Sequence, residues 1–383
     1  MRLPIYLDHA ATTPLAPEVL RAMEPFFTSV PWNAAASYAG GREARDAIER
    51  ARLSVAHMIG ASPDEIFFTS GGTESDNWAL KGMPVPDIQQ RPHGLVSAIE
   101  HSAVLETADA LRRAGWEISH IPVSPQGTVE PDDVEKRITS RTVFVSVMAA
   151  NNEVGTIQPI AELAAICRSR GVLVHVDAVQ AVGSLEIDVR KLGVDLLSLS
   201  GHKIYGPKGV GALYIRQGLP FGRWMDGGSQ ERGMRAGTVN VAGVVGFGAA
   251  CDLVRKKQLE QNARVARLRD GFCKSLQDRL SDILLTAAEA PRLPHFAHIC
   301  FRGVEGEAIL TGLDAAGVYA SAGAACSAGS RETSHVLRAM GITDEWARGA
   351  VRFTLGWDTT EEALDYTVAA LEEVTQELRR QGR

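Results

Sequence analysis

Short β-rich runs alternate with helical patterns between about residues 64 and 215 of the chain. Spacings of three and four residues between apolar positions predict helices at 102–114 and at 160–170, the second followed by Gly171 as a C-cap. Strands that alternate with helices are typical of βαβ units and of a mostly parallel sheet. The candidate strands are 66–69, 94–99, 143–148, 172–176, 196–199 and 211–215.

The pattern changes past residue 255. A charged helical stretch at 253–280 is followed by shorter mixed segments, and the chain ends in a helix that begins near residue 359 with a capping-box spacing. The 383 residues are enough for two domains of about 100 to 200 residues each. We therefore predict an α/β protein with a domain boundary near residue 255.

Composition excludes several classes of protein. Forty Lys and Arg against 46 Asp and Glu give a net charge of −6, so direct nucleic-acid binding through bulk charge is not expected. The longest uncharged apolar stretch, 241–251, is shorter than the about 20 residues that cross a bilayer. No secretory signal is evident, and we expect a cytoplasmic protein. Five scattered cysteines without a C-x-x-C pair indicate neither a disulfide framework nor a zinc site.

Polar clusters follow five of the predicted strands. Ligands of open parallel sheets bind beyond the carboxyl ends of the strands, so these clusters are expected to meet at one site. They occupy residues 70–75, 100–101, 151–153, 177–180 and 200–203.

These clusters contain the parts that pyridoxal phosphate requires. The turn at 71–73 opens a helix, whose N–H groups and dipole favour a phosphate. Asp177 ends a buried strand and needs a cationic partner, for which a protonated ring nitrogen is suitable. Lys203 is a candidate amine for a Schiff base with an aldehyde, and His101 offers a flat ring or a proton relay.

Each of these residues, taken alone, also has a purely structural interpretation. Asp177 fits a helix cap, Lys203 a solvated loop position, His101 a cap of the next helix and 71–72 an ordinary turn. Their joint placement at strand ends favours a shared ligand site over these separate structural roles.

The pattern S-x-x-K at 200–203 and S-D-N at 75–77 also occurs in serine β-lactamases and penicillin-binding proteins. The order along the chain is the reverse of theirs and no Lys-Thr-Gly occurs, so we set that hypothesis aside.

Cys326 differs from the other cysteines. It lies in a run of small residues at 321–330, whereas Cys167, Cys251, Cys273 and Cys300 have apolar or helical surroundings. A thiolate on such a loop can approach a cofactor and then meet a second protein. An incidental cysteine in a loop is the alternative.

With these motifs in place, the sequence resembles the pyridoxal phosphate-dependent cysteine desulfurases of the NifS/IscS type, within the class V aminotransferase family. The resemblance runs from residues 6–13 to the final helix. It implies an aspartate aminotransferase-like fold, with a large domain at 15–255 and a small domain at 1–14 and 256–383 that carries the cysteine loop at about 321–334. The matching stretches are 68–77, 100–101, 151–153, 177–180, 200–203, 233–238 and 334–337.

The resemblance also implies a role for individual residues. Lys203 would hold the cofactor as a Schiff base, Asp177 would pair with the ring nitrogen, and Gln180 would contact the ring hydroxyl. His101 would stack on the ring and move protons, and Cys326 would be the nucleophile. The phosphate would be bound by Gly72, Thr73, Ser200 and His202, with Thr238 from the other subunit of a homodimer; Asn152 would lie beside the cofactor and Arg352 would bind the substrate carboxylate.

The implied reaction converts L-cysteine to L-alanine and leaves a persulfide on Cys326, which passes sulfur to an acceptor protein. The acceptor remains open: an iron-sulfur cluster scaffold, a tRNA or cofactor thiolation enzyme, or a DNA phosphorothioation system. A selenocysteine lyase or aminotransferase of the same fold is the main alternative, and a partner protein with a vestigial site is another. The chain departs from the common family pattern at 33–40, at Asp8-His9 and at 323–326.

Overall fold

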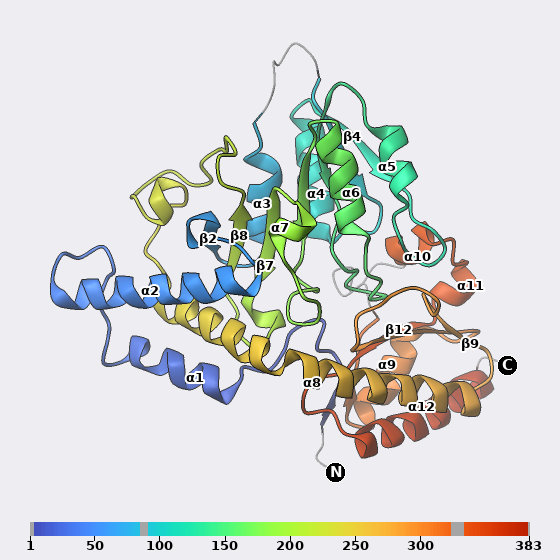
Figure 1. Ribbon diagram of the computed structural model, residues 1–383. Coiled ribbons are helices and arrows are strands. Elements are labelled where there is room, and N and C mark those ends of the chain that lie inside the picture. Colours follow the sequence, from blue (N-terminus) through green and yellow to red (C-terminus); the bar gives the residue numbers. More distant parts are fainter. Residues whose placement is uncertain (1–3, 85–90, 323–332, 382–383) are drawn as a thin grey trace.

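The computed structural model describes residues 4–84, 91–322 and 333–381 (Figure 1). A seven-stranded sheet forms its larger body, in the order β2-β8-β7-β6-β5-β3-β4. Only β8 runs antiparallel to its neighbours, so the predicted mostly parallel sheet is confirmed. The strands are β2 (Ile66–Thr69), β3 (His93–Ser97), β4 (Glu117–Ile121), β5 (Thr142–Ser146), β6 (Leu173–Asp177), β7 (Leu196–Ser200) and β8 (Gly211–Ile215).

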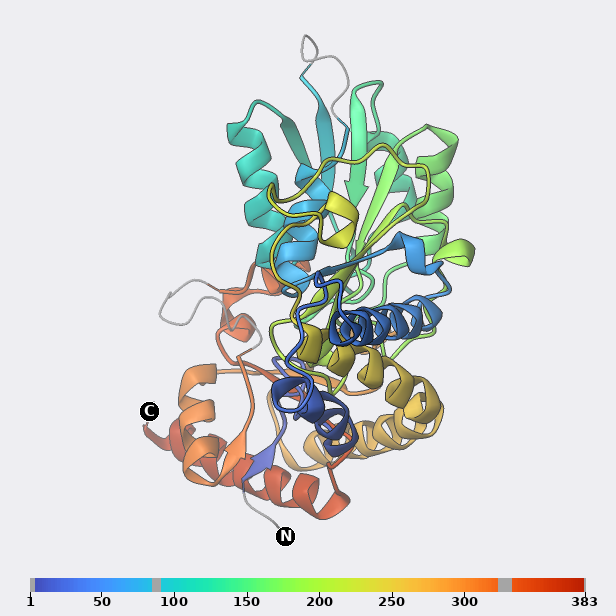
Figure 2. The same cartoon turned by 90° about the vertical axis from the view of Figure 1, so that its left-hand side faces the viewer.

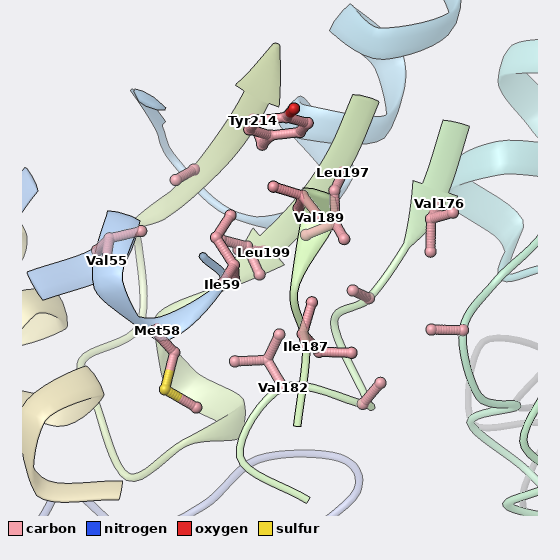
Figure 3. Close-up of a cluster of buried hydrophobic side chains, with 14 of the residues drawn as sticks. Val55, Met58, Ile59, Val176, Val182, Ile187, Val189, Leu197, Leu199 and Tyr214 are labelled. Carbon is pink, nitrogen blue, oxygen red and sulfur yellow. The ribbon is translucent and has the colours of Figure 1, made fainter. Parts of the chain in front are cut away.

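Helices cover both faces of this sheet. Because side chains alternate along a strand, Leu197 and Leu199 of β7 face one core while Leu196 faces the other. Figure 3 shows the first core, where Val55 and Ile59 approach strand residues such as Leu199. That core is covered by α2 (Ala39–Met58), α6 (Ile160–Ser169), α7 (Val189–Leu192) and the first part of α8 (Val241–Arg279), and the opposite core by α3 (Gly72–Lys81) and α4 (Ser102–Arg113).

A smaller body contains an antiparallel sheet in the order β12-β10-β9. The N-terminal strand β1 pairs in parallel with β11, so the start of the chain joins this C-terminal body. Its separate core includes Phe301, Leu313, Phe353 and Leu371. The elements are β1 (Ile5–Tyr6), β9 (Ile283–Leu285), β10 (Phe296–Phe301), α9 (Gly306–Ala315), β11 (Val318–Tyr319), β12 (Ala350–Thr354) and α12 (Glu361–Gln381).

Helix α8 connects the two bodies, which Figure 2 shows one above the other. It has 39 residues and begins at Val241, earlier than the charged stretch that predicted it. Val254 packs in the core of the sheet and Val265 in the core of the smaller body. The predicted domain boundary at residue 255 therefore falls inside one helix, and the division into domains stays a prediction. Within the described ranges, no helix combines the length and apolar character needed to cross a membrane.

The remaining helices are short. α1 (Pro17–Met23) packs beside α8, and α5 (Pro131–Arg137) beside α6. α10 (His335–Ala339) and α11 (Asp344–Ala347) contribute Val336 and Ala347 to a fourth core, together with Met148 from the loop after β5 and Cys300 from β10. This fourth core joins the carboxyl edge of the sheet to the smaller body.

Candidate active site

A pocket of about 560 Å³ opens at the carboxyl ends of the parallel strands. Residues at or after the carboxyl ends of β2, β3, β5, β6 and β7 line it, together with Ala10, Ala11, His335 of α10 and Arg352 of β12. The site predicted from strand ends is thus a single hollow in this fold. Ten of the predicted residues line it: Gly72, Thr73, His101, Asn152, Asp177, Gln180, Ser200, His202, Lys203 and Arg352.

One end of the pocket suits an anion. Gly71 has a backbone φ of +153°, which residues other than glycine rarely adopt, and α3 begins at the next residue. Ser200 Oγ is buried nearby and makes no hydrogen bond to any described residue. Burial, with Lys203 and Lys208, lowers the pKa of His202 to about 4, so its ring is neutral at pH 7. A helix N-terminus and an unused hydroxyl are groups that bind phosphate.

Asp177 lies at the end of β6 and is buried. One of its carboxylate oxygens accepts the Val179 N–H at 2.9 Å. Burial raises the pKa of Asp177. The hydrogen bond from the Val179 N–H and the nearby His101 and Lys203 lower it, but the effect of burial is larger. A carboxylate in this position is stabilised by a cationic ligand group.

Lys203 projects from the turn after β7 toward the N-terminal segment. Its Nζ donates to the carbonyl oxygens of Ala10 and Ala11, the second at 2.9 Å. Gln180 Nε2 donates to the same Ala10 oxygen at 2.9 Å. The N-terminal segment of the smaller body therefore helps to position the amine, a contribution that the strand-end pattern did not predict.

His101 is both a helix cap and a pocket residue. It is the N-cap of α4, and its Nδ1 accepts the N–H of Ala103 at 3.1 Å. Burial lowers the pKa of the imidazole, so the neutral ring carries its proton on Nε2. The two interpretations of His101 are therefore compatible.

Arg352 enters the pocket from β12 and is 2% exposed. Its Nη1 donates to the Asn152 carbonyl oxygen at 2.6 Å and its Nη2 to Asp8 Oδ1 at 2.7 Å. Nε is buried and has no hydrogen-bond partner among the described residues. A guanidinium fixed in this way suits a planar carboxylate.

Three buried carboxyl groups had no predicted role: Asp76 and Glu153, which line the pocket, and Glu100, which lies near Asp76 and Asp177. Burial raises the pKa of Glu100 to about 8 and that of Glu153 to about 7, and it raises the pKa of Asp76 as well. Glu100 accepts the Met148 N–H at 2.7 Å, and Glu153 accepts the Ser334 hydroxyl at 2.7 Å. These residues occur in the quoted motifs, but burial of a carboxyl group leaves no sequence signal.

Thr238 does not line the pocket but is exposed on the surface, and Cys326 lies outside the described residues. Burial raises the pKa of the Cys167 and Cys300 thiols to about 12, and Cys251 and Cys273 are also buried. No described group of three or more His, Cys, Asp and Glu side chains could hold a metal ion.

The pocket fits pyridoxal phosphate in three respects. The amine of Lys203 can bond an aldehyde carbon, and the buried Asp177 can face a protonated ring nitrogen. The Ser200 hydroxyl, which has no hydrogen-bond partner among the described residues, and the start of α3 can receive a phosphate.

Comparisons with known proteins agree with this chemistry. The model of the family "Aminotransferase class-V" matches residues 5–367. "Cysteine desulfurase IscS" of Dictyoglomus turgidum is 48% identical over 379 residues, covering 99% of this chain and 96% of that protein. A solved "NifS-like protein" superposes with a TM-score of 0.92 at 38% identity, covering 98% of this chain and 100% of that one. A structure titled "SspA in complex with cysteine" has a TM-score of 0.80 at 31% identity, with coverage of 92% and 98%.

Proposed function

The chain belongs to the class V aminotransferase family, and on that premise we propose that it is a pyridoxal phosphate-dependent cysteine desulfurase. Its fold is the aspartate aminotransferase-like fold of its NifS-like structural relatives. The observation that carries the proposal is the convergence of Lys203, Asp177 and Arg352 on one pocket, from elements of both bodies. Relatives named cysteine desulfurases match it over nearly their whole length.

The cofactor would be held along the pocket. Lys203 would bond its aldehyde carbon, Asp177 would face the ring nitrogen, and Gln180 would lie beside the ring hydroxyl. Gly72, Thr73, Ser200 and His202 would receive the phosphate. When bound, pyridoxal phosphate supplies a ring that accepts electrons from the bonds at the substrate α-carbon.

Arg352 and Asn152 would hold the substrate. The buried guanidinium offers N–H groups to the α-carboxylate of L-cysteine, and the Asn152 carbonyl oxygen keeps that guanidinium in place. The Lys203 amine would take the α-proton of the substrate. The neutral His101 ring is suited to stack on the cofactor ring and to move protons.

Cys326 would then take the sulfur. Its thiolate attacks the substrate sulfur, a sulfur–sulfur bond forms, and the carbon–sulfur bond of L-cysteine breaks. The electron pair stays on carbon, which takes up a proton and leaves as L-alanine. L-Cysteine and a thiol thus give L-alanine and a Cys326 persulfide, and no external oxidant is needed.

Mass spectrometry after treatment with L-cysteine tests this step. We expect one added sulfur on the peptide that contains Cys326, and no alanine production by Cys326→Ser. Cys167→Ser is the matched control, because this buried thiol should leave the reaction unchanged. Alanine release by Cys326→Ser at the full rate would contradict the proposal and favour a lyase or aminotransferase that uses no thiol.

Borohydride reduction tests the cofactor attachment independently. The reduced cofactor should be found on the peptide that contains Lys203. Attachment at another lysine, or none, would refute the assignment of Lys203.

The active enzyme would be a homodimer that delivers sulfur to an acceptor protein. Thr238 is exposed, as a residue that serves the other subunit must be before assembly. Light scattering should give twice the mass of the 41.1 kDa chain. Thr238→Ala should weaken cofactor binding without changing that mass, and unchanged binding would contradict the role of Thr238.

A further inference from the structure

The segment 233–238 lies close to the start of α3, and only Thr238 has so far been given a role in it. Arg235 makes a two-point contact with Glu74 in the first turn of α3. Arg235 Nε donates to Glu74 Oε1 at 2.8 Å, and Nη2 donates to Oε2 at 3.1 Å. The side chains are only 21% and 11% exposed, respectively. The paired geometry is the strongest that an arginine and a carboxylate form.

Glu74 also fixes the turn that precedes α3. Its Oε2 accepts the Ser70 N–H at 2.7 Å, in the manner of a glutamate that caps a helix start. This bond orients the backbone from Ser70 through Gly71. Gly72 and Thr73 line the pocket, and their N–H groups, in the first turn of α3, have no acceptor within the helix.

A carboxylate at this position would ordinarily oppose phosphate binding. Glu74 is in the same helical turn as Gly72 and Thr73, and like charges at such distances repel. Burial raises the pKa of Glu74, but hydrogen bonds from Arg235 and Ser70 outweigh burial and bring that pKa below its ordinary value. The hydrogen bond to Glu74 in turn raises the pKa of Arg235. Both groups are therefore charged at neutral pH and cancel each other.

We propose that Arg235 and Glu74 act as a positioning pair for the phosphate group of the cofactor. Glu74 holds the turn open through the Ser70 N–H, and Arg235 neutralises Glu74 so that a phosphate can bind beside it. The inference rests on the proposed function only in taking pyridoxal phosphate as the ligand. It makes segment 233–238 a determinant of cofactor affinity through Arg235, independently of Thr238.

Absorbance titration of cofactor-depleted enzyme with pyridoxal phosphate, and separately with pyridoxal, tests the pair. Arg235→Ala should weaken pyridoxal phosphate binding by about tenfold or more, the scale of a lost charged hydrogen bond. Pyridoxal has no phosphate, so its affinity should change by less than about twofold. Arg232→Ala is the matched control: Arg232 directly precedes the segment 233–238, but it donates to the Ile66 carbonyl oxygen at 2.7 Å and stacks on Phe67.

The double variant Arg235→Ala/Glu74→Gln shows whether the uncompensated charge of Glu74 causes the loss of affinity for pyridoxal phosphate. Removing the charge of Glu74 should recover part of the affinity that Arg235→Ala loses, because the uncompensated carboxylate causes most of the loss. The proposal is overturned if the double variant binds no better than Arg235→Ala. Equal losses for pyridoxal and pyridoxal phosphate, or a loss as large in Arg232→Ala, would also overturn it. A wild-type enzyme that binds neither ligand would instead contradict the proposed function.

Discussion

Replacing Glu153 by glutamine tests whether the carboxyl group behind Arg352 is protonated in the folded protein. Glu153 is 1% exposed, and one oxygen accepts the Ser334 hydroxyl while the other has no hydrogen-bond partner among the described residues. His298 Nε2 lies 3.7 Å from that second oxygen, and burial keeps the His298 ring neutral at pH 7 by lowering its pKa to about 3. Burial raises the pKa of Glu153 to about 7, although the Ser334 hydrogen bond and the charge of Arg352 both lower it.

The magnitude follows from the shift in pKa. A carboxyl group that titrates at 4.5 when unfolded and near 7 when folded stays protonated in the folded state over that interval. Unfolding then releases a proton, so the free energy of unfolding falls as the pH rises through the interval. The total effect is about 3 kcal/mol. For 383 residues this corresponds to about 4 °C in Tm.

Thermal unfolding of wild type and Glu153→Gln at several pH values measures the effect. The difference in Tm, variant minus wild type, should grow by about 3 °C between about pH 5 and about pH 8, because glutamine has no proton to lose. Glu162→Gln, an exposed position on α6, is the matched control and should show a constant difference. A constant difference for Glu153→Gln as well would refute the protonated state, and a decrease would mean that the carboxylate is stabilised in the fold.

Three further changes test the pocket. Arg352→Lys should raise KM for L-cysteine by about tenfold or more, since lysine cannot pair with a carboxylate at two points, and leave cofactor absorbance unchanged; an unchanged KM would contradict carboxylate binding by this residue. Ser200→Ala should raise the dissociation constant of pyridoxal phosphate by about tenfold, measured by titration, because the buried hydroxyl is lost; equal binding would exclude it from the phosphate site. Gly72→Ala places a methyl group 2.8 Å from Val179 Cγ2 and should cost about 1–3 kcal/mol in urea unfolding, a loss that Val179→Ala should partly reverse.

The sheet was the most predictable part of the fold. Its buried strands are continuous apolar runs, and the predicted bounds differ from those of β3, β5 and β6 by only one or two residues. The edge strand β4 was not predicted because most of its residues are exposed or half-buried and show no apolar run. β10 was not predicted either, since His298 interrupts its apolar run; that ring is buried and paired with Thr286 at 2.9 Å.

The site was predictable wherever a strand end carried a distinctive side chain. The rule that parallel strands present their carboxyl ends together brings Asp177 and Lys203 into one pocket, from the adjacent strands β6 and β7. Asp8 was not predicted to contact Arg352 because the two residues are 344 positions apart and meet only where the N-terminal segment joins the smaller body. Nor does the sequence indicate which carboxyl groups are buried, as Glu100 is.

The exposed middle of α8 has a geometric consequence for the pocket. None of the residues 255–264 is buried, so a continuous helix alone spans the gap between the part of α8 in one core and the part in the other. Deleting a single residue there would put the two parts of α8 out of register by about 100° around the helix axis and about 1.5 Å along it. The fourth core, which also joins the two bodies, would oppose that rotation. Lys203 and Arg352 sit on opposite bodies. The number of residues in this stretch of α8 therefore helps to set the relative orientation of the two bodies whose residues Lys203 and Arg352 line one pocket.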